Sequence, residues 1–342
     1  MKKTNFLVLL LASLYLFSCS EDDNETTSLT DTENATTIDC SVAQKKAFGI
    51  RNDVKLETIE TIAANLAPYN TADFPDFSPV VQLQFQLGNS SYAASGTLIS
   101  PEWVLTAAHI FAKKKEGKFT LISPETVTAT FGNDPNSSSA KSKIAEIKIH
   151  PAYLAKHDDY DDYDMCLIKL SAPINNINPA KLYFNTKKLE KMTAWIAGFG
   201  QYKASQGQNP DLFAKKHAFQ NVIDKVLTDS ITTGTNTYKT VGLVVDFDDP
   251  CGKNNTLNDN KIFSEALAPI TSNATPTKYE GVIVEGDSGG PMLAKINDQW
   301  QVVGISAYEV VFIEGKQSDY STVAISIGLS AYQNWIEENI KN

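Results

Sequence analysis

The chain has 342 residues, of which 42% are hydrophobic, 10% are aromatic and 20% are charged. Such a chain can build a hydrophobic core without disulfide or metal cross-links, and its composition excludes a disordered protein, a collagen-like repeat and a disulfide-rich miniprotein. The 30 Lys and Arg residues against 40 Asp and Glu residues give a formal charge of −10. This acidic balance argues against a nucleic-acid partner, because the phosphates would repel the protein.

Residues 1–18 have the features of an export signal. Lys2 and Lys3 precede a mostly apolar run from Phe6 to Phe17, which is too short for a comfortable membrane span. The run ends in Leu-Phe-Ser-Cys at Cys19, which resembles the lipobox of bacterial lipoproteins, where the Cys is lipidated and becomes the mature N-terminus. The alternative is an ordinary cleaved signal with an incidental cysteine. A lipid on Cys19 would anchor the chain to a membrane surface.

Residues 19–66 are predicted to form an acidic, polar tether and N-terminal extension. Cys19 is followed by Ser-Glu-Asp-Asp-Asn-Glu and then by a stretch rich in Thr, Asn and Ser. Low hydrophobicity and like charges keep such a segment solvated. The acidic cluster also resembles the surface-export tag of lipoproteins in the Bacteroidetes group of bacteria, which implies a location at the outer membrane or cell surface.

The remaining three cysteines divide into two kinds. Cys166 lies in an apolar strand pattern and is predicted to be a buried free thiol. Cys40 and Cys251 either form a disulfide, since an exported protein meets an oxidising compartment, or stay unpaired.

Beyond the tether the chain is predicted to be mostly β-strand. Apolar and polar residues alternate in residues 80–87 and 144–149, which is typical of a strand with one buried face. Gly, Asn, Asp and Pro clusters separate further β-rich runs, which lie at residues 194–199, 241–247, 281–284, 302–306 and 322–327. One helix is predicted at the C-terminus, around Trp335 and Ile336. Many short strands joined by turns indicate an all-β barrel or sandwich.

Three short motifs carry chemistry. Residues 285–291 read Glu-Gly-Asp-Ser-Gly-Gly-Pro and present Ser288 on a tight turn, whose amides can stabilise an oxyanion. Serine needs a base, and the apolar strand after Ser95 delivers His109 directly after two alanines. Asp164 leads into the apolar run 165–170, where a buried carboxylate can hold an imidazole in the required tautomer.

In this chain order, His109, Asp164 and Ser288 resemble the triad of the trypsin/chymotrypsin-like serine peptidases. The resemblance spans most of residues 79–341 and includes Ala-Gly-Phe-Gly at 197–200. It implies that residues 67–342 form two packed six-stranded antiparallel β-barrels with a C-terminal α-helix, and that the site lies between the barrels.

The same resemblance implies a role for each site residue. His109 would be the general base, Asp164 would orient it, and Ser288 would attack a polypeptide substrate. The amides of Gly286 and Ser288 would form the oxyanion hole. No cofactor or metal is expected. The acidic run 158–162 could bind calcium through its oxygens, but it lacks a recognisable metal-loop pattern and is predicted to be a solvated loop.

The sequence departs from the family pattern at the segment where activation would begin. In the family a freed apolar N-terminus pairs with the Asp that precedes the nucleophile, but residues 67–70 do not resemble such a start, and Asp287 has no identifiable cationic partner.

His150 is predicted to be structural, whereas His157 and His217 lie among polar residues and are expected to be solvated. Residues 201–279 are expected to hold large surface loops.

Substrate specificity is predicted from five positions of the S1 pocket, which receives the substrate's P1 side chain. Val282 stands six residues before the nucleophile, where the family sets the charge at the base of the pocket. Ala307-Tyr308-Glu309 replaces Ser-Trp-Gly, so Ala307 lacks a hydroxyl that would support the triad Asp, and Glu309 replaces a Gly that keeps the pocket mouth open. Ala324 stands at the pocket wall. These residues predict a small or apolar P1 residue.

Two functions from different classes follow. The first is a membrane-anchored serine endopeptidase of the bacterial envelope that forms an acyl-enzyme. The alternative is a catalytically impaired surface lipoprotein that keeps the fold and acts as a binding or inhibitory protein. Two features favour this alternative: Glu309 at the pocket mouth, and the absence of a recognisable activation start at residues 67–70. A third interpretation is a non-peptidase acyl hydrolase, because the same chemistry could attack esters.

Overall fold

The structure is a computed structural model. It describes residues 47–87, 89–115, 118–155, 162–202, 214–233, 235–253, 255–259, 268–269, 272–310 and 318–341. The predictions for the signal segment, Cys19, Cys40, His157 and residues 158–161 lie outside the described residues.

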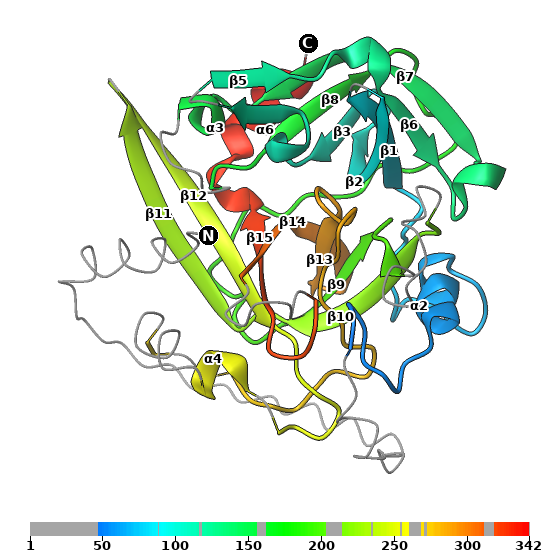
Figure 1. Ribbon diagram of the computed structural model, residues 1–342, viewed down its shortest axis with the longest axis vertical. Coiled ribbons are helices and arrows are strands. Elements are labelled where there is room, and N and C mark those ends of the chain that lie inside the picture. Colours follow the sequence, from blue (N-terminus) through cyan, green and yellow to red (C-terminus); the bar gives the residue numbers. More distant parts are fainter. Residues whose placement is uncertain are drawn as a thin grey trace.

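The first half of the fold is a closed antiparallel barrel with the strand order β1-β2-β3-β8-β7-β6 (Figure 1). Its strands are β1 (Val80–Leu87), β2 (Ser90–Ser100), β3 (Trp103–Thr106), β6 (Thr128–Phe131), β7 (Ala140–Ile149) and β8 (Cys166–Leu170). A small hairpin, β4 (Ala112–Lys115) and β5 (Lys118–Leu121), and two 3-10 turns, Pro124–Thr126 and Pro135–Ser137, lie between β3 and β7. This barrel confirms the predicted first half of the fold.

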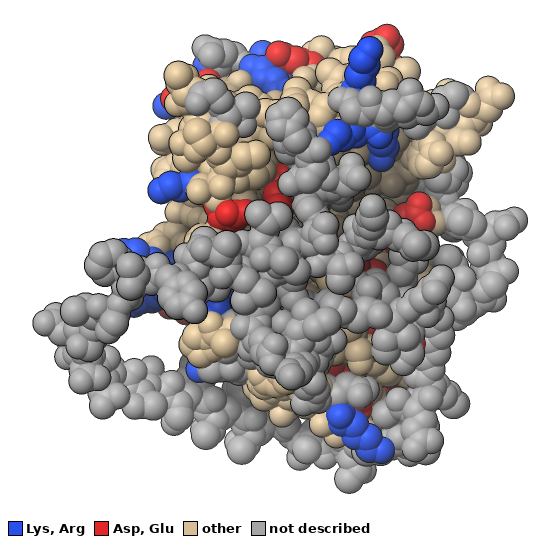
Figure 2. Space-filling model, turned by 60° about the vertical axis from the view of Figure 1, so that its left-hand side comes forward, with Lys and Arg blue, Asp and Glu red and all other residues tan. Residues whose placement is uncertain are grey.

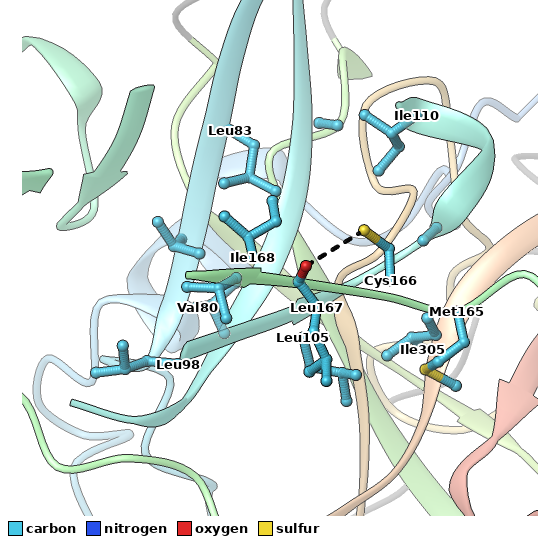
Figure 3. Close-up of a cluster of buried hydrophobic side chains, with 14 of the residues drawn as sticks. Val80, Leu83, Leu98, Leu105, Ile110, Met165, Cys166, Leu167, Ile168 and Ile305 are labelled. Carbon is cyan, nitrogen blue, oxygen red and sulfur yellow. Dashed lines mark hydrogen bonds between the residues drawn. The ribbon is translucent and has the colours of Figure 1, made fainter. Parts of the chain in front are cut away.

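The barrel interior is filled by aliphatic side chains from facing strands, among them Leu83, Leu98 and Leu105 (Figure 3). Each is fully buried, which stabilises the fold by about 1.5–3 kcal/mol per side chain. Cys166 lies in the same cluster as a buried free thiol, as predicted, and its Sγ lies 3.6 Å from the Leu167 carbonyl oxygen. Burial raises the pKa of this thiol well above its usual value, so it is not a nucleophile at neutral pH.

The second half is an antiparallel sheet with the order β10-β9-β13-β14-β15-β12-β11. Its strands are β9 (Thr193–Gly198), β10 (His217–Val222), β11 (Lys225–Thr233), β12 (Asn236–Asp246), β13 (Pro291–Ile296), β14 (Gln299–Val310) and β15 (Val323–Gly328). The all-β, chymotrypsin-like fold class is confirmed, although this sheet has seven strands where six were expected. The long β11–β12 hairpin supplies the additional strand at the edge.

The strand predicted at residues 241–247 is the second half of β12. The expectation of large surface loops in residues 201–279 is wrong for β10, β11 and the first half of β12, which lie in residues 217–240. The β-branched residues of this segment, such as Ile231 and Val241, favour this structure. The hairpin extends along one side of the molecule (Figure 1). Near its tip, Tyr238 meets the edge of the His150 ring that follows β7, so the hairpin contacts the first barrel.

Short helices complete the fold. They are α2 (Leu56–Ala63), α3 (Pro151–Ala155), α4 (Thr256–Asp259) and α6 (Gln333–Ile340), with 3-10 turns at Ala108–Ile110 and Leu329–Ala331. The helix predicted at the C-terminus is thus a 3-10 turn followed by α6, with Ile336 buried. In the part of the chain that the structure describes, no helix is long and apolar enough to span a membrane.

The N-terminal extension is described from Ala47 onward, where it packs on the second half of the fold. Ala47 and the α2 residues Ile59 and Ile62 are buried, and α2 lies against β10. The predicted boundary at residues 66 and 67 remains a prediction.

Candidate active site

The ends of β3 and β8 bring His109 and Asp164 together. These strands pair with Thr106 opposite Cys166, so the residue that follows β3 and the residue that precedes β8 come out of the barrel on the same side. His109 lies in the 3-10 turn Ala108–Ile110, and its backbone N–H donates to Asp164 Oδ1 at 2.7 Å. The carboxylate thus holds both the backbone and the ring of the same histidine.

Ser288 comes from the loop that joins residues 281–284 to β13. Gly286 and Gly289 adopt φ values of +102° and +81°, which a residue with a Cβ rarely adopts. A Cβ on Gly289 would collide with Thr106 Oγ1 and the Ser95 carbonyl oxygen. Glycine at this position lets the nucleophile loop of the second sheet lie directly against β2 and β3 of the first barrel.

The three predicted side chains form a continuous hydrogen-bonded relay. His109 Nδ1 lies 2.6 Å from Asp164 Oδ2, and His109 Nε2 lies 2.9 Å from Ser288 Oγ. Asp164 is fully buried, whereas the His109 side chain is 21% exposed. The imidazole therefore has a carboxylate on its inner nitrogen and a hydroxyl on its outer nitrogen, at the edge of the protein.

The peptide planes of the nucleophile turn are fixed by hydrogen bonds. The Glu285 carbonyl accepts from the Gln201 N–H at 2.9 Å, and Gly290 N–H donates to the Asp287 carbonyl at 2.9 Å. Because a trans peptide holds its N–H opposite its C=O, the Gly286 N–H points away from Gln201. Within the described part of the chain, neither the Gly286 nor the Ser288 amide donates a hydrogen bond.

Asp287, which separates these two amides in the sequence, is fully buried, and several hydrogen-bond donors surround its carboxylate. Its Oδ1 accepts from the Gly200 N–H at 2.9 Å and lies 2.8 Å from His217 Nε2. Its Oδ2 accepts from the Val284 N–H at 3.0 Å, and the Tyr202 hydroxyl lies 3.5 Å away.

His217 is therefore not solvated, and that expectation is wrong. The residue is 1% exposed and begins β10, where its ring contacts the ring of Tyr202 at a centroid distance of 4.2 Å. Sequence reasoning missed this partner of Asp287 because the residues before it, Lys215 and Lys216, are charged. Apolar and polar residues do not alternate from His217 to Val222, so no local pattern marks this strand or its buried histidine.

The five predicted pocket residues lie on three neighbouring segments. Val282, Ala307 and Ala324 are buried, whereas Tyr308 and Glu309 are partly exposed. Glu309 stands opposite Ala324 in the β14–β15 pairing. Its carboxylate accepts from the Ser318 hydroxyl at 2.7 Å, and Ser318 Oγ also lies 3.3 Å from the Ile283 carbonyl.

The other candidates lie apart from this site. His150 is buried among the rings of Tyr238, Tyr332 and Trp335, and burial lowers its pKa to about 4. Cys251 is in a disulfide whose partner lies outside the described residues. No group of His, Cys, Asp and Glu side chains in the described ranges is suited to a metal ion.

The described residues that Figure 2 leaves visible form no large patch of one charge sign. There the described Lys and Arg side chains lie in small separate groups, with Asp and Glu side chains between them.

A six-stranded barrel packed on a second antiparallel sheet, with a Ser-His-Asp relay, defines the trypsin-like class of serine proteases. Comparison of the sequence agrees, since residues 72–336 match the Trypsin family. The chain belongs to this family.

The chain is similar to curated members of the same class. It is 25% identical over 253 residues to rat "Transmembrane protease serine 11G" and 26% identical over 257 residues to mouse "Transmembrane protease serine 11E". These matches cover 72% and 73% of this chain and 49% of each relative. The chain therefore spans about half the length of the curated relatives it matches.

Proposed function

We propose that the protein is a serine endopeptidase that cleaves polypeptides through an acyl-enzyme intermediate. The observation that carries this proposal is the relay from the buried Asp164 through His109 to Ser288, with distances of 2.6 and 2.9 Å. The 2.9 Å distance is within the range required for proton transfer from the Ser288 hydroxyl to His109, and at 2.6 Å Asp164 holds the imidazole in place.

The first half of the reaction uses all three side chains. Ser288 Oγ attacks the substrate carbonyl carbon while His109 Nε2 takes the hydroxyl proton, which gives a tetrahedral oxyanion and an imidazolium. The buried Asp164 carboxylate lies 2.6 Å from His109 Nδ1 and stabilises the imidazolium by accepting from its Nδ1–H. The amides of Gly286 and Ser288 donate to the oxyanion. Collapse of the intermediate breaks the C–N bond, and His109 returns the proton to the leaving amine.

Water completes the cycle. It attacks the acyl-Ser288 ester while His109 again accepts a proton, and the second intermediate releases the carboxylic acid product and restores the Ser288 hydroxyl. The chemistry needs no cofactor, because the charge that develops is met by a base and by backbone donors within the chain.

For specificity, we propose that the enzyme prefers a small or apolar P1 residue. Val282 brings no charge to the position before the nucleophile loop, and Glu309, opposite Ala324, already accepts a hydrogen bond from Ser318. Cleavage profiling on a peptide library tests this choice. A strong preference for Arg or Lys, lost in Glu309→Gln, would show instead that Glu309 recognises a basic side chain.

We further propose that the protein is a bacterial lipoprotein anchored through Cys19. The support is the sequence of residues 1–25, with its short apolar run, Leu-Phe-Ser-Cys end and acidic cluster. Metabolic labelling with a fatty-acid analogue tests the anchor. The wild type should be labelled and Cys19→Ala should not, and equal labelling of both would refute the anchor.

A fluorophosphonate probe tests the enzymatic proposal, because it modifies only a serine activated by its base. We expect labelling of the wild type, loss of labelling in Ser288→Ala, and unchanged labelling in Ser91→Ala, which alters an exposed serine of β2. A folded protein that is never labelled would favour the binding or inhibitory alternative.

A further inference from the structure

Asp287 presents a physical problem that the family resemblance leaves open. The carboxylate is fully buried, and a buried charge is costly unless it is paired and hydrogen-bonded. In the family, a freed N-terminal amine meets this need, but the chain offers no apolar start near residues 67–70. The described residues around Asp287 supply a partner of another kind.

His217 is that partner. Its Nε2 lies 2.8 Å from Asp287 Oδ1, and the two side chains are 1% and 0% exposed. Backbone N–H groups donate to both oxygens of Asp287, so its carboxyl group acts as an acceptor, and we assign His217 Nε2 as the donor of this contact. The strand holds the ring in place, because His217 pairs with Gly198 of β9 and its ring lies against Tyr202 and Phe219. Tyr202 also approaches the carboxylate. Burial, and then the nearby Asp287 carboxylate, raise the pKa of the Tyr202 hydroxyl well above its usual value, so this hydroxyl stays neutral.

The pair is coupled to the nucleophile turn through neighbouring backbone. Asp287 lies between the two amides assigned to the oxyanion hole, and its Oδ1 also accepts from Gly200 N–H. The next residue, Gln201, donates to the Glu285 carbonyl and so sets the direction of the Gly286 N–H. A change at His217 therefore reaches the oxyanion donors through Asp287 and residues 200–201.

The N-terminal extension packs against this region through the backbone of Gly49. Gly49 N–H donates to the Ser318 carbonyl at 2.6 Å, and Val282 N–H donates to the Gly49 carbonyl at 2.7 Å. A Cβ on Gly49 would collide with Tyr202 and lie 2.5 Å from a methyl carbon of Val284. The backbone of residue 49 thus packs between the aromatic ring beside Asp287 and the residues before the nucleophile turn.

We propose that His217 positions the nucleophile turn by donating to Asp287, so that the protease is active without cleavage of the chain between residues 47 and 288. This inference rests on the proposed peptidase function. His217 is a positioning residue, since it acts on the oxyanion donors through Asp287 and does not touch the substrate.

The experiment uses the full exported chain, purified with inhibitors of other proteases. Mass spectrometry of the fluorophosphonate adduct reports whether the labelled chain is continuous from residue 47 to Ser288. We expect the continuous wild-type chain to be labelled and to turn over peptide substrate. Labelling that appears only after a cut in residues 47–79 would overturn the inference and leave the peptidase function intact. No labelling before or after cutting would instead defeat the peptidase function.

Two substitutions separate positioning from general stability. His217→Leu removes the donor, and we expect kcat to fall by about 10²–10³-fold, the effect of losing an oxyanion donor, with a smaller change in KM. His217→Gln keeps an N–H donor and should restore kcat to within about tenfold of the wild type. His150→Leu makes the same replacement at a buried histidine away from the turn and should keep kcat. Unchanged kcat in a folded His217→Leu protein would refute the role, and so would a folded Gln variant as impaired as the Leu variant.

Discussion

The replacement Asp164→Asn probes the relay most directly, because it keeps the size of a fully buried side chain and removes only its charge and one acceptor. The wild-type carboxylate accepts two short hydrogen bonds from His109, at 2.7 Å from the backbone N–H and 2.6 Å from Nδ1. An amide has one oxygen for these two donors. If its NH2 group faces Nδ1, the imidazole must carry its proton on Nε2, where it can no longer accept from Ser288.

The size of the effect follows from these contacts. A hydrogen bond to a charged group contributes about 1.5–3 kcal/mol, and the imidazolium formed during attack also loses its buried counter-charge. We therefore expect a loss of about 3–5 kcal/mol in transition-state stabilisation, which corresponds to a reduction of roughly 10²- to 10⁴-fold in kcat/KM.

The assay is the second-order rate of fluorophosphonate labelling together with kcat/KM for a peptide from the library. The matched control is Asp73→Asn, since the Asp73 side chain is 85% exposed and should leave both rates unchanged. If a folded Asp164→Asn protein reacted within tenfold of the wild type, the carboxylate would not govern the tautomer, and the reasoning would be refuted.

Three further predictions concern the pocket and two buried bases. Glu309→Gly removes the carboxylate that accepts from Ser318. We expect the ratio of kcat/KM for substrates with a large P1 residue to kcat/KM for substrates with a small one to rise at least tenfold, about the effect of one or two methylene groups in a pocket. An unchanged ratio would argue against the pocket assignment. Burial lowers the pKa of Lys216 from 10.5 to about 7, so its charge penalises the fold fully below pH 7, and stability rises by roughly 3–5 kcal/mol as the pH rises to 10.5. Denaturant unfolding of Lys216→Met should lack this rise, and an equal slope in both proteins would contradict it. Burial lowers the pKa of His150 to about 4, so stability should fall by about 3 kcal/mol between pH 6.5 and 4; His150→Gln should flatten that fall, and an undiminished loss would place the acid sensitivity elsewhere.

The site residues were predictable because each lies in a short segment with its own chemical pattern. The glycines around Ser288 are required by positive φ and close approach, and such requirements are visible in sequence. His109 and Asp164 adjoin apolar runs that become paired strands. Their meeting follows from the register of those strands, which local sequence does not specify, so the family resemblance supplied it.

The environment of His217 was not predictable in this way. The neighbouring Lys216 suggested a solvated segment, yet Lys216 is 1% exposed and donates to the Phe77 carbonyl at 2.7 Å. The partner of His217 lies 70 residues further along the chain. Burial of both side chains is decided by which strands become neighbours, and no pattern within a few residues records that.

Two histidine–carboxylate pairs of similar separation lie in the part of the chain that the structure describes, and solvent access distinguishes their roles. In both, the carboxylate is fully buried and also accepts backbone N–H donors. The His109 side chain is 21% exposed and has Ser288 on its second nitrogen, so a substrate can reach the atom that gains and loses the proton. The His217 ring is 1% exposed and packed against aromatic rings, so no substrate can reach it. The first pair can therefore exchange protons with a reactant, whereas the second can only hold a loop in place.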